Sequence, residues 1–186
     1  MVRKIWLKIL GGILLVSSLG FAAYADVDSP LRLTLSLDKG IYRAGDKMIF
    51  ELTFKNISQE DQYFYINQDY NALLFQIVNE KKITQAYDLT RIHAKVWKRG
   101  DFKLVKAQEE FEWIVEGTLT VSGTAPRIEF DDSFIPLSDM GEYSVFIEYT
   151  ATAGHGQEFG LKNVFMDTLK SNVRKFKVID QQKGLK

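Results

Sequence analysis

The chain has 186 residues, of which 46% are hydrophobic and 26% charged, with 24 Lys plus Arg against 24 Asp plus Glu and no Cys. This composition excludes a disordered chain, and the missing Cys excludes disulfides, thiolate metal sites and a Cys nucleophile. The balanced charge argues against a dedicated nucleic-acid binder, and the length suits one domain with its own core.

The first 25 residues have the layout of a secretory signal peptide. Three cations and no acid lie near the start, and 17 uncharged residues follow, from Ile9 to the small-residue site Ala23-Tyr24-Ala25. An uncleaved membrane anchor is the alternative, but a span needs about 20 apolar residues and this run contains three glycines. We therefore expect cleavage near Ala25-Asp26, a periplasmic or secreted bacterial protein, and no stable membrane insertion after cleavage.

The rest of the chain divides simply. Removing residues 1–25 takes away three cations and no acid, so 21 cations face 24 acids and the net charge becomes −3. We expect residues 26–30 to form a lead-in, residues 31–179 one domain, and the polar residues 180–186 a flexible tail.

Alternation of apolar and polar residues predicts β-strands along most of this domain. In Leu31–Leu37, four leucines alternate with three polar residues, which gives one face for a core and one for water. Turn signals such as Asp38-Lys39-Gly40 and Arg43-Ala44-Gly45-Asp46 separate the strands, and we predict no amphipathic helix after residue 25. The other predicted strands are 48–55, 63–66, 72–78, 92–97, 111–116, 118–121, 127–130, 143–149 and 175–178. Nine or ten short strands are typical of an all-β sandwich or barrel.

One segment resembles a feature of immunoglobulin-like sandwiches. Asp139-Met140-Gly141-Glu142-Tyr143-Ser144-Val145 resembles the tyrosine corner, in which a Tyr near the start of a strand bonds its hydroxyl to nearby backbone. The second Cys of antibody domains follows that Tyr by two residues, where this chain has Val145. The resemblance therefore implies a buried apolar contact in place of the disulfide.

A second segment, Gly40–Asp46 followed by the strand that ends at Asn56, is similar to the opening of bacterial envelope immunoglobulin-like domains, including macroglobulin-type repeats. The same layout resembles the small proteinase-inhibitor domain of bacilli and, with Leu169-Lys170-Ser171-Asn172, the accessory domains of deuterolysin-type proteases. These matches cover residues 31–56 and 134–179. They imply a single immunoglobulin-like antiparallel β-sandwich of about 9–10 strands, an architecture that hosts many unrelated functions.

Signals for catalysis or metal binding are weak. The two histidines, His93 and His155, belong to no motif of a zinc protease, serine hydrolase or phosphate loop. The acid pairs Glu109-Glu110 and Asp131-Asp132 point to opposite faces if they lie on strands. We expect no enzyme activity, no cofactor and no metal site.

The aromatic stretch 62–70 is the candidate binding surface. If Phe64 and Ile66 face the core, Tyr63 and Tyr65 face outward, and exposed Tyr is enriched in protein interfaces. Cross-strand aromatic packing within a sheet is an equally good interpretation. Tyr70 follows nearby and belongs to the same prediction.

Two functions remain open, and both are non-enzymatic. The first is recognition of another protein in the cell envelope or outside the cell, through edge strands and the tyrosines; the resemblance adds protease inhibition by the loop Ala151–Lys162. The second is a small-molecule or glycan carrier with a pocket between the sheets, lined by Trp97, Trp113 and Tyr149. The predicted binding residues are Tyr63, Tyr65, Tyr70, Trp97 and Trp113.

Charge is segregated in the middle of the chain. A basic run, residues 91–106, has a net charge of +5, and an acidic run, residues 107–116, has −4. A basic face for an anionic partner is one interpretation. Because the two runs are adjacent, we favour a hairpin in which opposite charges pair across strands.

Overall fold

The computed structural model describes residues 29–66, 73–88, 98–122, 125–131, 133–151 and 154–180. Within these ranges the chain is predominantly β, with thirteen strands and two short 3-10 helices, η2 (Arg99–Asp101) and η3 (Gly154–Phe159). The predicted all-β class is confirmed. None of the helices in these ranges is long and apolar enough to cross a membrane.

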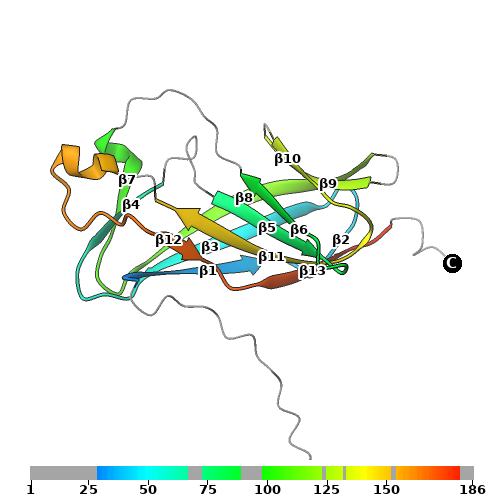
Figure 1. Cartoon of the computed structure of the whole chain (residues 1–186), viewed down its shortest axis with the longest axis horizontal. Helices are drawn as coiled ribbons and strands as arrows, with labels where there is room; N and C mark the ends of the chain where they lie inside the picture. Colours follow the sequence, from blue (N-terminus) through cyan, green and yellow to red (C-terminus); the bar gives the residue numbers. More distant parts are fainter. Residues whose placement is uncertain are drawn as a thin grey trace, which may run out of the picture.

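The strands form two larger sheets and one small sheet (Figure 1). The first sheet has the order β1 (Leu31–Leu37), β3 (Lys47–Asn56), β8 (Glu110–Ser122), β9 (Ala125–Phe130) and β10 (Ser133–Pro136). The second sheet has the order β2 (Ile41–Tyr42), β13 (Arg174–Val178), β11 (Gly141–Thr150), β5 (Leu73–Asn79) and β6 (Thr84–Asp88), and β12 (Thr168–Lys170) also pairs with β11. The third sheet has β4 (Gln62–Tyr65) and β7 (Phe102–Val105). These pairs are antiparallel except β2 with β13.

The core lies between the two larger sheets. Burial alternates along β1 and β3, so one face of each strand is covered and the other is open. Phe50 of β3 and Phe75 of β5 meet edge to face across the sheets, with ring centroids 5.1 Å apart. Such rings each bury about 150–250 Å², which makes aromatic packing a large share of the stabilisation.

The turn that precedes β3 forms where the sequence predicts it. Gly45 has a φ of 87°, a conformation that glycine adopts without strain, and its N–H donates to Leu119 O at 2.7 Å. The Asp46 carboxylate accepts the Arg43 N–H and pairs with Lys39 at 2.8 Å. These bonds hold the reversal of the chain against β8.

Some strands differ from the prediction. The predicted strands 111–116 and 118–121 form one strand, β8, that continues through Gly117. A Cβ on Gly117 would lie 2.7 Å from Ile128 Cγ2, so this glycine permits close packing instead of making a turn. β2, β6, β7, β10 and β12 were not predicted, because two to five residues give too little alternation to detect. The predicted strand 92–97 lies outside the described residues.

Side chains close one open side between the two sheets. Leu35 in edge strand β1 donates its N–H to Asn172 Oδ1 (2.8 Å), and its carbonyl accepts from Asn172 Nδ2 (3.2 Å) and Arg174 Nε (2.8 Å). Ser171 bonds the backbone of Ile147 in β11 in a similar way. Its Oγ accepts the Ile147 N–H, and its own N–H donates to Ile147 O, both at 2.9 Å. Asn172 and Ser171 thus supply the donors and acceptors that a neighbouring strand would supply.

We expect Asn172→Ala to lower the free energy of unfolding by about 2 kcal/mol, because both backbone groups of the buried Leu35 lose a partner. Urea unfolding followed by circular dichroism measures the change. Lys175→Ala, at an exposed position of β13, is the control and should change stability by less than about 0.5 kcal/mol. Equal small losses in both variants would contradict the role of Asn172.

Candidate functional site

The third sheet separates two apolar clusters at one end of the molecule. The Phe64 ring joins the main core and stacks on Phe54, with centroids 4.9 Å apart. Tyr65 points to the opposite face and joins a smaller cluster with Phe102 and Leu161. Successive side chains of a strand alternate between faces, so the predicted opposition of Phe64 to its tyrosine neighbours is confirmed.

The exposure predicted for Tyr65 is wrong. Its side chain is 2% exposed, and its ring meets Phe102 edge to face at 5.6 Å. Leu161, just after η3, packs on the same face and covers it. Tyr63 remains partly exposed. The predicted Tyr70 and Trp97 lie outside the described residues.

The covering segment is bonded to β4 along its backbone. Tyr63 donates its N–H to Asn163 O at 2.9 Å and accepts the Phe165 N–H at 2.7 Å, which forms a parallel bridge between Tyr63 and Val164. Gly156 is buried beneath Val164, and a Cβ there would lie 2.7 Å from Val164 Cγ2. Within the loop 151–162, predicted as an inhibitory loop, residues 154–159 form η3 and pack on the third sheet.

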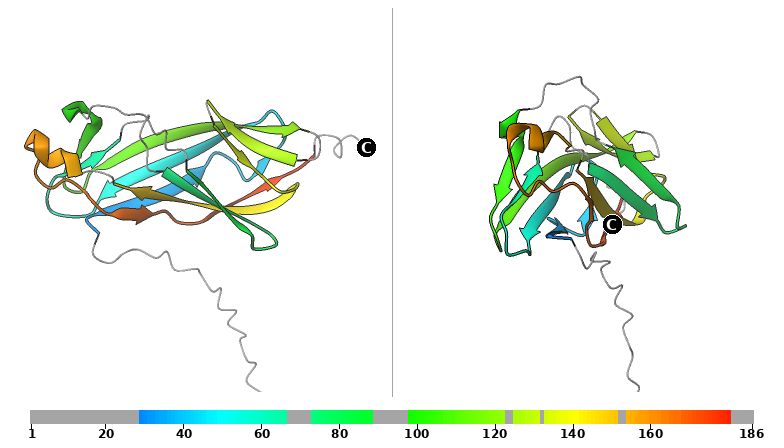
Figure 2. Two further views of the ribbon diagram at one scale, coloured as in Figure 1. Left: turned by 45° about the horizontal axis from the view of Figure 1, so that its top comes forward. Right: turned by 60° about the vertical axis from the view of Figure 1, so that its left-hand side comes forward.

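A row of apolar side chains remains at the rim of this sheet. Leu104 is the register partner of Tyr63, and Val164 is its bridge partner, so the three side chains share one face. We call Leu104, Tyr63 and Val164 the tip row. Leu104 is 36% exposed, Tyr63 and Val164 are partly exposed, and nearby Met166 is 56% exposed. Figure 2 shows β4, β7 and both 3-10 helices gathered at one end of the molecule.

A buried asparagine joins the third sheet to β3. Asn56 is fully buried, and its Nδ2 donates to Glu60 O (2.7 Å) and to Val105 O at the end of β7 (3.0 Å). Its Oδ1 accepts the N–H and the hydroxyl of Ser58. Each polar atom of the side chain is therefore satisfied, and the turn before β4 is held in place.

Tyr149 links the tip to the second sheet from inside the core. Its hydroxyl donates to Tyr65 O at 2.7 Å, and its ring meets Phe54 edge to face at 5.3 Å. Burial raises the pKa of the Tyr149 hydroxyl. Trp113 is 7% exposed and stacks on Phe54. Aromatic rings thus fill the space in which Trp113 and Tyr149 were predicted to line a pocket, so that prediction is wrong for these two residues.

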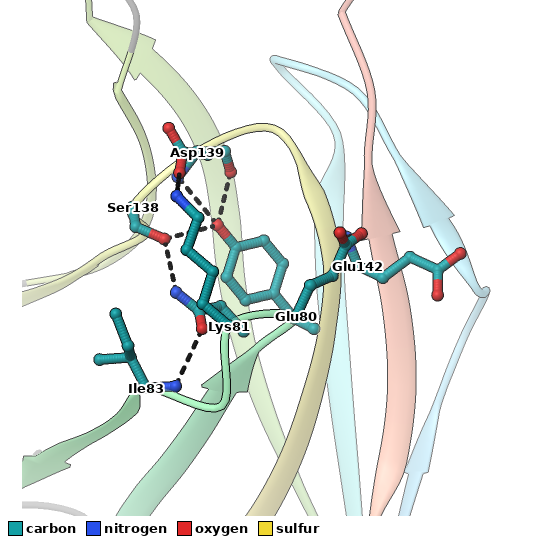
Figure 3. Close-up of polar contacts among 8 residues, drawn as sticks. Glu80, Lys81, Ile83, Ser138, Asp139 and Glu142 are labelled. Carbon is teal, nitrogen blue, oxygen red and sulfur yellow. Dashed lines mark hydrogen bonds and ion pairs between the residues drawn. The ribbon is translucent and has the colours of Figure 1, made fainter.

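The predicted tyrosine corner forms at the other end of β11 (Figure 3). The Tyr143 hydroxyl donates to Asp139 O and accepts the Asp139 N–H at 3.0 Å. Its ring stacks on Phe176 at 5.4 Å, and Val145 is fully buried. The expected bond from the tyrosine to nearby backbone and the apolar contact at Val145 are confirmed.

The turn between β5 and β6 is bonded to this corner. Asn79 Nδ2 donates to Ser138 Oγ at 3.1 Å, and Asn79 Oδ1 accepts the Ile83 N–H at 3.0 Å (Figure 3). Lys81 Nζ lies 3.3 Å from an Asp139 carboxylate oxygen. An open hollow of about 460 Å³ lies beside these residues. Within the described ranges, no three metal-ligating side chains gather there or elsewhere. The network therefore acts as a structural brace that fixes the β5–β6 turn.

The charged runs pair differently from the prediction. Glu110 and Glu116 of the acidic run form ion pairs with lysines of β3, at 2.7 and 3.3 Å. Between the two runs, the described residues show one pair, Lys106 with Glu109 at 3.7 Å, within a turn. Charges do pair across strands, but the partner strand is β3. Such exposed pairs contribute about 0–1 kcal/mol each.

Comparisons with known proteins identify no family. No family model and no curated protein matches the chain. Among solved structures, the chain is similar to the alkylpurine DNA glycosylase AlkC of Pseudomonas fluorescens bound to DNA containing an abasic site analog, with 8% identity over 81% of this chain and 30% of that chain, and a TM-score of 0.41. It is also similar to a beta-glucosidase from Listeria innocua in complex with isofagomine, with 16% identity over 80% of this chain and 16% of that chain, and a TM-score of 0.36. The chain thus spans less than a third of either protein, and likenesses this low carry no conclusion about fold or function.

Because burial raises the pKa of Tyr149, we expect stability to fall at alkaline pH. Above about pH 10 the unfolded chain loses the proton of the Tyr149 hydroxyl while the folded chain keeps it. The contribution of Tyr149 to the free energy of unfolding is therefore complete below about pH 10 and declines above it, by up to about 1.4 kcal/mol per pH unit. Urea unfolding between pH 8 and 11 measures the slope. Tyr149→Phe should be less stable at pH 8, because the hydrogen bond to Tyr65 O is lost, but its stability should decline less steeply with pH. Parallel declines would contradict the assignment.

Proposed function

We propose that the chain is an exported, non-enzymatic immunoglobulin-like β-sandwich domain that recognises another protein through its tip row. The tyrosine corner at Tyr143 and the buried Val145 support this fold assignment, together with two sheets that share one core. Export is supported by the cation-then-apolar layout of residues 1–25 and the Ala23-Tyr24-Ala25 site. The proposed location is the periplasm or the extracellular space.

The tip row is the observation that carries the proposal of protein recognition. It combines a tyrosine with two aliphatic side chains, all at least partly exposed, on one face of a small sheet. Tyrosine is one of the residue types that provide most of the binding energy in the centre of protein interfaces, and the buried centre of an interface is more apolar than its rim. Polar residues surround them, since Lys103 and Asn163 are exposed on the neighbouring positions.

The row is also rigid. Tyr63 is bonded through its backbone to Asn163 and Phe165 on one side and is paired with β7 on the other. Next to it on the same face, Tyr65 packs in the smaller cluster, and its carbonyl accepts the hydroxyl of Tyr149. A surface that is ordered before binding loses little conformational entropy on association, which favours affinity.

This proposal replaces the narrower alternatives. Protease inhibition by the loop 151–162 rests on the resemblance alone, and η3 takes up residues 154–159 of that loop. A carrier pocket loses support because Trp113 packs inside the core. We propose a protein partner in the cell envelope or outside the cell that presents a complementary apolar groove.

The test is capture from the soluble envelope fraction on immobilised residues 26–186, followed by calorimetry with the purified partner. We expect Tyr63→Ala and Leu104→Ser to raise the dissociation constant at least about tenfold, as truncation of central interface residues does. Ile83→Ser is the matched control, because Ile83 is also exposed (53%) but lies at the β5–β6 turn. A partner that binds both tip variants as tightly as the native chain, or no partner for a folded native chain, would refute the proposal.

A further inference from the structure

Among the strands that the structure describes, none pairs with the outer edge of β6. The Asn79 N–H donates to Ile83 O at 3.2 Å, which fixes the odd-numbered residues of β6 as the ones bonded to β5. In an antiparallel ladder, alternate residues direct their N–H and C=O to opposite edges. Thr84 and Ala86 therefore direct theirs away from β5, and both side chains are exposed. Within the described ranges, β6 is the last strand on this side of the second sheet.

Three other edges in the described part of the chain are guarded. The side chains of Asn172 and Arg174 form hydrogen bonds with the backbone N–H and C=O of Leu35 in β1. β10 ends in Pro136, whose carbonyl accepts the Tyr87 hydroxyl at 3.2 Å, and β2 is only two residues long. Proteins guard edges in such ways because open edges pair with other chains. Residues 84–87 of β6, Thr-Gln-Ala-Tyr, contain no proline and no charge.

We propose that β6 pairs with β6 of a second copy of this chain, antiparallel, with the two-fold axis at Ala86. Two identical edges complement each other in this arrangement, since Ala86 and Ala86 of the second copy exchange two N–H···O bonds. The small alanine side chain leaves no clash at the axis. Because residues 84–87 are uncharged, no like charges meet there. The two second sheets then form one continuous sheet.

Side-chain hydrogen bonds already hold β6 in place. The Asn79 bonds to Ser138 and to Ile83 hold the turn that leads into β6, and Tyr87 ties the far part of the strand to β10 (Figure 3 shows the turn). Pairing therefore requires little ordering of the strand. One strand edge gives a contact at the small end of protein interfaces, so the dimer exchanges with the monomer.

Sedimentation equilibrium of residues 26–186 between roughly 10 µM and 1 mM, a range suited to such small interfaces, tests the proposal. We expect a monomer–dimer equilibrium in the native chain. Ala86→Pro removes an N–H that the fold does not use, so the dimer dissociation constant should rise at least about tenfold while the urea midpoint stays unchanged. Ala86→Ser keeps the N–H and a small side chain, and it should dimerise like the native chain.

A native chain that stays monomeric throughout this range, or an Ala86→Pro variant that dimerises as well as the native chain, would overturn the proposal. If the proline variant fails to fold, hydrogen exchange in the native chain decides, because protection of the Ala86 amide must rise with protein concentration. Tyr63→Ala should leave the dimer unchanged. The dimer and the recognition of a partner by the tip row therefore succeed or fail separately.

Discussion

The hydrogen bond from the Tyr149 hydroxyl to Tyr65 O fixes how the third sheet is attached to the rest of the molecule. Both atoms are buried among rings of the main core, where an unpaired polar atom costs about 1–3 kcal/mol, so the bond sets the position of β4 relative to β11. With the backbone of Tyr65 held there, alternation sends Phe64 into the main core and Tyr65 into the smaller cluster. Tyr63 lies two residues before Tyr65 and therefore on the same face of β4, which places it in the tip row.

Side chains take the place of missing strands at several points of this fold. Asn172 and Ser171 complete the ladders of β1 and β11, and Asn56 joins β3 to the third sheet. Each of these side chains satisfies backbone groups that would otherwise lie unpaired in partly or fully buried positions. The chain has no Cys, and such bonds, rather than disulfides, join elements that are distant in sequence.

Local alternation predicted the long strands because their faces differ in burial, as in β1, β3 and β11. It also predicted which side chains of β4 share a face. It could not predict that Tyr65 is covered, because Leu161 lies far along the chain and reaches this face only in the folded state. It also divided β8 into two strands at Gly117, a glycine that allows close packing against Ile128 within one strand. The bond between Asn79 and Ser138 likewise joins segments that no local pattern connects.

The clamp between Leu35 and Asn172 also bears on how the chain reaches this structure. The two residues are 137 positions apart, and β13 follows immediately after Asn172. β1 therefore cannot be joined to the second sheet until residues 172–174 are available, so this clamp forms only after β1 to β12 have been made. Contacts of such long separation slow folding. Because β1 stays unclamped until residues 172–174 have been made, the polypeptide remains able to pass through a narrow channel for longer than a protein built from local contacts.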